Sequence, residues 1–313
     1  MPPNPSALIY AVFMHTSKKL TRIRDVMRYL HAVTVSKDGL LVVSQTDPLN
    51  SIRERIVVPR QVLHGLVVAL HLKLDHPSSH QLGLAMRRYL FALDMDKAIK
   101  EATDTCHQCQ SMKSHPTLVQ EQSTSDPPPT VGCTFAADVI RRERQCIFVM
   151  RETVTSYTVT SIISDERHET LRDAIICSVS TMHPLDGPST VVRTDPAPAF
   201  VSLATDDILR SSRISIEIGR TKNPNKNPVA EKAVAELETE LKRQQQGSGP
   251  VTPVTLAIAT ARLNARIRSR GLSSREMWYQ RDMFTNEQLP IQDMDLIQSQ
   301  YENRKQNHPH SMK

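Results

Sequence analysis

Three carboxylates constrain this chain more than any other feature, because each falls on a different structural element. Asp138 interrupts an apolar, β-branched run, FAADVI, of the kind that forms strands. Asp195 precedes Pro196, and a residue before proline is pushed toward extended geometry, so we expect Asp195 at a strand end. Glu231 follows after 35 intervening residues, in the first turn of a helix that Asn227 is placed to cap.

The surroundings of these carboxylates favour a positively charged ligand. An ionised group in or beside a sheet is costly unless something compensates it, and a metal ion would do so at Asp138. Singly, Asp138 could be an edge-strand residue, Asp195 a turn former and Glu231 a charge that complements the helix dipole. In this order and on these elements, they predict a catalytic site that binds two ions of Mg²⁺ or Mn²⁺. The expected helix would pack inward through a stripe of apolar residues, with Glu231 at its edge: Ala230, Val234, Leu237 and Leu241.

A second constellation lies upstream and combines histidines with a C-x2-C pair. Cys106 and Cys109 are preceded by three candidate partners, His71, His76 and His80. Two histidines and two cysteines are a common ligand set of a closed, tetrahedral structural zinc site. A redox role for the cysteine pair would require a thioredoxin-like βαβ context, which this stretch lacks. The other cysteines, Cys133, Cys146 and Cys177, are expected to pack as small hydrophobic residues in a reducing compartment.

The order of the expected elements from residue 131 onward defines a fold class. Three short β-branched runs separated by polar turns predict an antiparallel meander, and a helix, a strand, a helix and a strand precede the Glu231 helix. This order predicts a mixed α/β domain of the ribonuclease-H-like class, with a five-stranded mixed sheet, flanking helices and a small helical zinc-binding domain before it. The expected elements are 131–140, 145–152, 157–163, 165–182, 189–194, 200–211, 213–218 and 253–269.

These motifs together resemble the integrases of retroviruses and long-terminal-repeat retrotransposons, in particular the gypsy-type Pol polyprotein. The sequence RRY at 87–89 and the sequence GLSSREMWYQRDMF at 271–284 add to the resemblance. The resemblance implies zinc ligation by His71 and His76 with Cys106 and Cys109, in preference to the pair His76 and His80. It also implies metal-dependent processing of DNA 3′ ends and strand transfer, with Asp138, Asp195 and Glu231 as catalytic residues. Element ends and target DNA would be the partners, the protein would form a homo-oligomer, and it would act in the nucleus.

The domain organisation that follows has five parts. We expect an N-terminal extension with a small β-hairpin at 1–68, a His2Cys2 zinc-binding domain at 69–113 and a linker at 114–130. The ribonuclease-H-like catalytic core would span 131–285, and a polar tail would occupy 286–313. No run approaches the roughly 18 apolar residues of a membrane span, and we find no signal peptide.

Two alternative functions remain at this stage. The first is a catalytically inactive or host-retained integrase fragment that binds DNA or protein; it is favoured because we expect the family's small basic C-terminal domain to be missing. The second is a ribonuclease-H-like nuclease, which the upstream His/Cys module disfavours. The formal net charge of +6 suits a polyanionic partner but also fits an ordinary solvated surface, so it does not separate these functions.

Overall fold

The structure is a computed structural model that describes residues 33–46, 52–111, 126–142, 144–219, 227–244, 249–268 and 271–306. Most of the expected linker at 114–130 and the end of the expected tail lie outside these residues. The chain divides into two compact units: the first comprises 1–116, 266–276 and 280–290, and the second comprises 117–265, 277–279 and 291–313. No described helix has both the length and the apolar character needed to cross a membrane.

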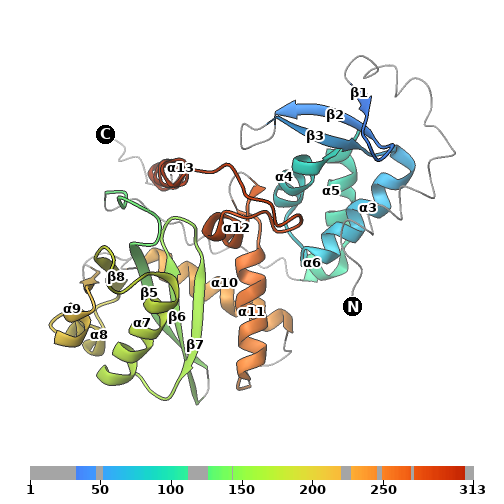
Figure 1. Ribbon diagram of the computed structural model, residues 1–313. Coiled ribbons are helices and arrows are strands. Elements are labelled where there is room, and N and C mark those ends of the chain that lie inside the picture. The colour runs from blue at the N-terminus through green and yellow to red at the C-terminus, as the bar shows by residue number, and fades with distance from the viewer. Residues whose placement is uncertain are drawn as a thin grey trace, which may run out of the picture. The chain divides into compact units, whose positions relative to one another are not determined.

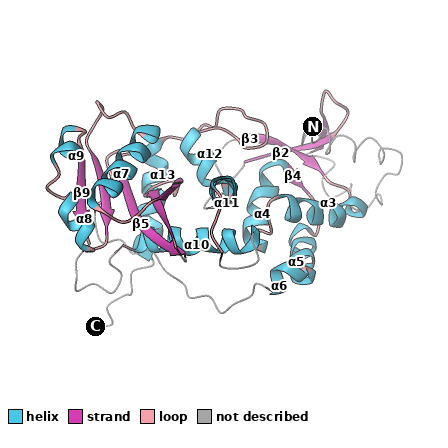
Figure 2. Ribbon diagram, turned by 90° about the horizontal axis from the view of Figure 1, so that it is seen from below, coloured by secondary structure: helices cyan, strands magenta, loops and turns pink. Residues whose placement is uncertain are grey.

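The second unit is built on a five-stranded mixed sheet (Figures 1 and 2). Its strands are β5 (Thr134–Arg142), β6 (Gln145–Glu152), β7 (Thr158–Ile163), β8 (Thr190–Thr194) and β9 (Ile214–Ile218). They lie in the order β7-β6-β5-β8-β9, with β7, β6 and β5 antiparallel and β5, β8 and β9 parallel. A meander joined to two parallel strands is the sheet of the ribonuclease-H-like fold, so the predicted fold class is confirmed.

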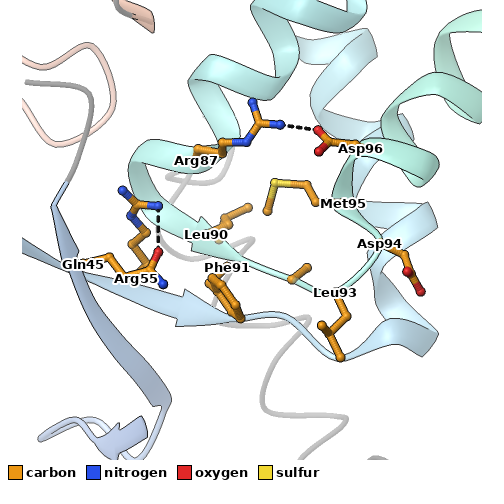
Figure 3. Close-up of a pocket in the computed structure, with 10 residues that line it drawn as sticks. Gln45, Arg55, Arg87, Leu90, Phe91, Leu93, Asp94, Met95 and Asp96 are labelled. Carbon is orange, nitrogen blue, oxygen red and sulfur yellow. Dashed lines mark hydrogen bonds and ion pairs between the residues drawn. The ribbon is translucent and has the colours of Figure 1, made fainter. Parts of the chain in front are cut away.

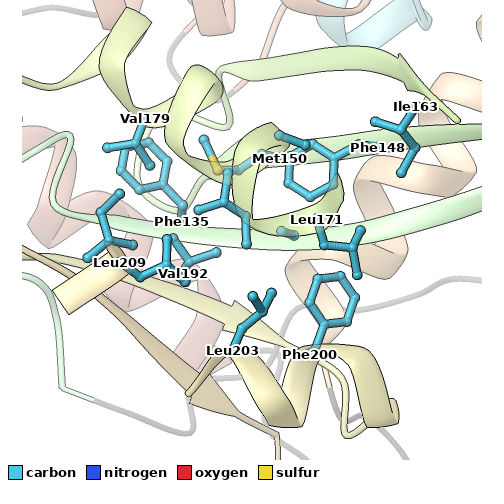
Figure 4. Close-up of a cluster of buried hydrophobic side chains, with 14 residues drawn as sticks. Phe135, Phe148, Met150, Ile163, Leu171, Val179, Val192, Phe200, Leu203 and Leu209 are labelled. Carbon is cyan, nitrogen blue, oxygen red and sulfur yellow. The ribbon is translucent and has the colours of Figure 1, made fainter. Parts of the chain in front are cut away.

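Helices cover both faces of this sheet because its central strands alternate between two apolar cores. Phe135 and Ala137 of β5 belong to a core with α7 (His168–Met182), α8 (Pro198–Leu203) and α9 (Asp207–Ser211), shown in Figure 4. Ile140 of β5 belongs to a second core with α10 (Pro228–Gln244) and α11 (Pro253–Ala265). The odd-numbered residues of β5 therefore face α7, and the even-numbered residues face α10.

Helix α10 packs on the sheet through the face that the sequence predicted. Its buried apolar residues are Ala230, Ala233, Leu237 and Leu241, and Val234 is partly buried against the same core. Alanine at the first two positions lets the helix axis approach the strands closely, and the leucines fill the space further along. Glu231 lies beside this stripe, in the first turn.

Between Val33 and Ser111, the described residues of the first unit form a smaller sheet and four helices. The sheet contains β1 (Val33–Val35), β2 (Leu41–Thr46), β3 (Ile52–Val57) and β4 (Leu90–Phe91), in the order β1-β2-β3-β4, with β4 parallel to β3. The helices are α3 (Arg60–Lys73), α4 (Ser79–Tyr89), α5 (Met95–Thr105) and α6 (His107–Ser111). An open pocket beside β4 is lined by Arg55, Arg87 and the 90–96 segment, and its two arginines are engaged with Gln45 and Asp96 (Figure 3).

A buried ionic network joins α4 to the segment that follows α11. The Arg88 side chain is fully buried and donates hydrogen bonds to the Gly271 carbonyl at 3.0 Å, to Glu276 at 2.8 Å and to Asp282 at 2.7 Å. The Tyr89 hydroxyl donates to the same Asp282 carboxylate. A buried guanidinium is tolerated only when charged partners and hydrogen bonds surround it, and this segment supplies both.

This network explains a difference between the expected and the observed division of the chain. The sequence predicted that residues up to 285 belong to the catalytic core, whereas 266–276 and 280–290 group with the first unit. A capping box at Ser273 and Glu276 fixes the local turn and holds the Glu276 carboxylate beside Arg88. RRY and GLSSREMWYQRDMF, which were separate motifs in the sequence, thus contribute to one cluster.

We predict that Arg88→Ala lowers the free energy of unfolding by about 3–5 kcal/mol, because it removes the buried cation from Glu276 and leaves Asp282 with only the more distant Arg53, at 3.8 Å. Arg87→Ala is the matched control, since Arg87 pairs with an exposed Asp96 and such pairs contribute at most about 1 kcal/mol. Urea unfolding of the whole chain, followed by circular dichroism, measures both. Equal losses in the two variants would contradict the importance of the network.

Candidate metal centres

Four side chains of the first unit converge in a geometry that suits one metal ion. His71 lies on α3, His76 just after it, Cys106 at the end of α5 and Cys109 on α6. The His71 Nε2 atom lies 3.2 Å from His76 Nδ1 and 3.2 Å from Cys109 Sγ, and Cys106 Sγ lies 3.2 Å from His76 Nδ1. A tetrahedral zinc ion with bonds of about 2.0–2.3 Å places its ligand atoms roughly 3.3–3.8 Å apart, so the donor set and its spacing fit zinc.

The end of α3 explains why the histidines are five residues apart. Asp75 and His76 both adopt positive φ, 58° and 59°, after the helix cap at Leu74. The His76 N–H donates to the His71 carbonyl at 2.9 Å, and the Asp75 N–H donates to the Leu72 carbonyl at 3.2 Å. These are the two bonds of a Schellman motif, which brings together the side chains of the residues that here are His71 and His76. Two imidazoles occupy the positions that usually make an apolar contact.

The rival histidine does not join this group. His80 is exposed on the first turn of α4, and the four ligand atoms that lie within 4.8 Å of one another come from His71, His76, Cys106 and Cys109. His71 is 2% exposed, and burial, followed by the charge of His76, lowers its pKa. A lowered pKa favours the neutral imidazole, which is the form that binds metal.

We predict that the whole chain binds one zinc ion and that Cys109→Ser abolishes stoichiometric binding. Structural zinc contributes about 10–16 kcal/mol of apparent binding free energy at neutral pH, so helical circular dichroism should fall in the variant and on chelation. Zinc content and the circular dichroism spectrum provide the measurement. Cys177 was expected to pack as a small hydrophobic residue but is exposed on α7, so Cys177→Ser is the control and should retain the ion. A Cys109→Ser protein with full zinc and helicity would refute a structural role.

The three carboxylates come from β5, from the end of β8 and from the first turn of α10. Asp138 is an even-numbered residue of β5 and therefore shares the face of Ile140, which packs against α10. Asp195 directly follows β8, where its Oδ1 accepts from the Ala197 N–H at 3.3 Å, and its charge acts on Asp138. Glu231 is in the first turn of α10 itself.

The charges of the other two carboxylates act on Asp138. Burial, and to a smaller extent the negative charges of Asp195, Glu231 and Glu166, raises the pKa of Asp138 to about 6. The Val139 N–H, which donates to Asp138 Oδ1 at 2.7 Å, opposes this shift. Asp138 thus bears an unfavourable charge that a nearby cation would stabilise.

The carboxylates are more widely spaced than the zinc ligands. Among the described residues, only the His/Cys group has all its ligand atoms within 4.8 Å of one another. The acidic set offers oxygen atoms alone, which suit hard cations such as Mg²⁺ and Mn²⁺, and a wider spacing leaves room for more than one ion. The chemistry of the donors therefore fits the expected ions.

Two residues near the carboxylates were not predicted to belong to the site. Glu166 contributes charge at Asp138 and forms a two-bond ion pair with the exposed Arg141. Asn227 was expected to cap α10 with its side chain, but its amide nitrogen donates to the carbonyls of Ala137 and Arg193. Those partners lie 90 and 34 positions away, and hydrogen bonds of such range leave no local pattern in the sequence.

A Ser–His–Asp group near α8 has the composition of a hydrolase triad but not its hydrogen bonding. His168 lies 2.8 Å from Ser202 Oγ and 2.7 Å from Asp206 Oδ2. The Ser202 hydroxyl donates to the Ala199 carbonyl at 2.7 Å, so its proton points to its own helix. Asp206 uses its other oxygen to cap α9. These hydrogen bonds instead connect α7, α8 and α9.

We predict that Asp138→Asn stabilises the protein in Mg²⁺-free buffer at pH 7.5 by at most about 3 kcal/mol. The folded pKa of about 6 lies above the ordinary value of 3.8, so the ionised group destabilises the fold above pH 6 and this cost disappears below pH 4. The gain should shrink as the pH falls through that window in urea unfolding. Asp207→Asn, at a 94% exposed side chain, is the control. A gain that does not depend on pH would contradict the electrostatic explanation.

Comparisons with known proteins found similar solved structures but no matching family. No family model matches it, and no curated protein matches it. One similar solved structure is the catalytic core domain of BIV integrase, with 18% identity, coverage of 48% of this chain and 95% of that chain, and a TM-score of 0.39. Another is a simian T-cell lymphotropic virus intasome in complex with PP2A regulatory subunit B56 gamma, with 15% identity, coverage of 72% and 79%, and a TM-score of 0.44. Similarities this weak do not show what reaction the chain performs. The chemical interpretation depends on the residues of the two sites.

Proposed function

We propose that this protein is an integrase-like polynucleotidyl transferase of the gypsy-type retrotransposon class, which processes DNA 3′ ends and joins them to target DNA. The observation that supports the proposal is that Asp138 lies in β5, Asp195 directly after the neighbouring β8, and Glu231 in the first turn of α10, which packs on the same sheet. The raised pKa of Asp138 supports it, because that carboxyl experiences the charge of both others.

In this proposal, the three carboxylates bind divalent cations through their oxygen atoms. Two such ions, when bound, would supply an activated water or 3′-hydroxyl and stabilise the leaving oxygen. The protein residues contribute a fixed, partly buried array of negative charge. At neutral pH Asp138 is largely ionised, so repulsion within the array favours cation binding.

The remaining assignments complete the proposal. The His2Cys2 module within 69–113 would bind structural zinc, and the core that begins at 131 would perform the chemistry. The net charge of +6 supports DNA as the partner, because neutralised phosphates supply most non-specific affinity. A homo-oligomer in the nucleus would hold the two element ends.

One observation favours a second candidate, an integrase-derived fragment without catalysis that binds DNA or protein. The carboxylate oxygens of Asp138, Asp195 and Glu231 do not form a group as close as that of the zinc ligands, within the described residues. If binding of cations does not draw them together, the chain keeps its zinc module but has no catalytic activity.

We predict that Mn²⁺-dependent nicking of a DNA substrate by the purified chain falls at least about 100-fold in Glu231→Gln, because a ligand carboxylate becomes a neutral amide. Glu238→Gln is a matched control two turns further along α10 and should retain activity. Gel analysis of labelled DNA measures both.

The same experiment separates the two functions. Nicking that survives Glu231→Gln would remove the catalytic assignment. A parent chain that binds DNA but shows no Mn²⁺-dependent nicking would favour the binding fragment.

A further inference from the structure

Asn227 is a buried polar residue at the point where the chain enters α10. It is 5% exposed, and its side-chain nitrogen donates to the Ala137 carbonyl at 3.0 Å and to the Arg193 carbonyl at 3.1 Å. Ala137 immediately precedes Asp138 in β5, and Arg193 is two residues before Asp195 in β8. One amide group therefore binds the backbone beside two of the three carboxylates.

The position of Asn227 corresponds to the place where β5 and β8 cease to pair. Their parallel ladder spans three residue pairs, of which the last joins Ala136 to Arg193. Beyond that pair β5 continues to Arg142 without pairing to β8. Backbone carbonyls where the two strands separate therefore need hydrogen-bond donors from outside the sheet. A primary amide carries two N–H groups on one nitrogen and can satisfy both carbonyls at once. An ionised aspartate of the same shape has no donor and would repel them.

The third carboxylate is connected to the same residue through the backbone. The Glu231 N–H donates to the Asn227 carbonyl at 2.9 Å, which makes Asn227 the start of the first turn of α10. A residue one turn away from Glu231 is thus bonded to both acidic strands. The Asn227 residue therefore links β5, β8 and α10 beside the three carboxylates.

We infer that Asn227 is a positioning residue that holds Asp138, Asp195 and Glu231 at the spacing required to bind divalent cations. This inference rests on the proposed function of the carboxylates. Asn227 acts through the backbone of its neighbours, because its nitrogen is engaged with two carbonyls. It differs in this respect from a metal ligand, which would contribute its side-chain oxygen.

The test uses the whole zinc-loaded chain and three variants. Mn²⁺ binding, measured by electron paramagnetic resonance, should weaken about 10–100-fold in Asn227→Ala, as for other residues that orient ligands. Asn227→Asp should bind Mn²⁺ more weakly than Asn227→Ala, because it places acceptors against two carbonyls. Asn227→Gln keeps the two donors and should recover part of the affinity. An Asn227→Asp protein that binds Mn²⁺ as well as the parent would show that Asn227 is a ligand, and would overturn the inference.

Asn264 provides a matched control for the general cost of losing a buried amide. It is also 5% exposed, lies on α11, and pairs with the N–H and the carbonyl of Thr158 at 2.8 and 2.7 Å. Asn264→Ala should reduce stability and leave Mn²⁺ affinity unchanged. If both alanine variants weaken Mn²⁺ binding equally, Asn227 has only a structural role.

Hydrogen exchange tests the positioning role without any metal. Asn227→Ala should accelerate exchange of the amides at 229–233, and Asn264→Ala should instead accelerate exchange near Thr158. Unchanged exchange at 229–233 overturns the inference whether or not Mn²⁺ binds. If the parent chain binds no Mn²⁺ but exchange at 229–233 increases in Asn227→Ala, the proposed function fails while the backbone link is supported.

Discussion

The alternation of side chains along β5 is the constraint on which the rest of the second unit depends. Phe135 and Ala137 must face α7, because they are apolar and fully buried there. Because neighbouring side chains of a strand point to opposite faces, Asp138 must then face α10. The apolar core and the acidic site are therefore coupled, since a shift of one residue in the register of β5 would bury Asp138 in the α7 core and expose Phe135 to the other face.

Much of this architecture could be predicted from the sequence, because its signals are local. Short β-branched runs, turn residues and the apolar stripe of α10 each depend on residues a few positions apart, and they predicted the mixed sheet that the structure confirms. The choice between His71 and His80 required more than spacing. It depended on the resemblance to integrases, and the structure supplies a physical reason, the reversal of the chain at Asp75 and His76.

The parts that could not be predicted depend on long-range hydrogen bonds. Arg88 is bonded to residues 183 to 194 positions away, and Asn227 to one that is 90 positions away. The sequence of RRY indicates a basic helix end that could equally face solvent. An asparagine before a proline indicates a helix start, but it does not indicate which groups the asparagine amide contacts. Both residues have a role that only the folded chain defines.

The geometry of the zinc ligands has a consequence for the order in which the module assembles. The turn after α3 brings His71 and His76 together, and Cys106 and Cys109 are one helical turn apart, so each pair forms from neighbouring residues. An ion captured by either pair would then close a single loop of 29 intervening residues between His76 and Cys106. Loop-closure entropy grows only with the logarithm of length, by about 0.6 kcal/mol per doubling. Insertions between α4 and α5 should therefore reduce zinc affinity little. One residue inserted between His71 and His76 would instead move these two ligands apart and reduce zinc affinity.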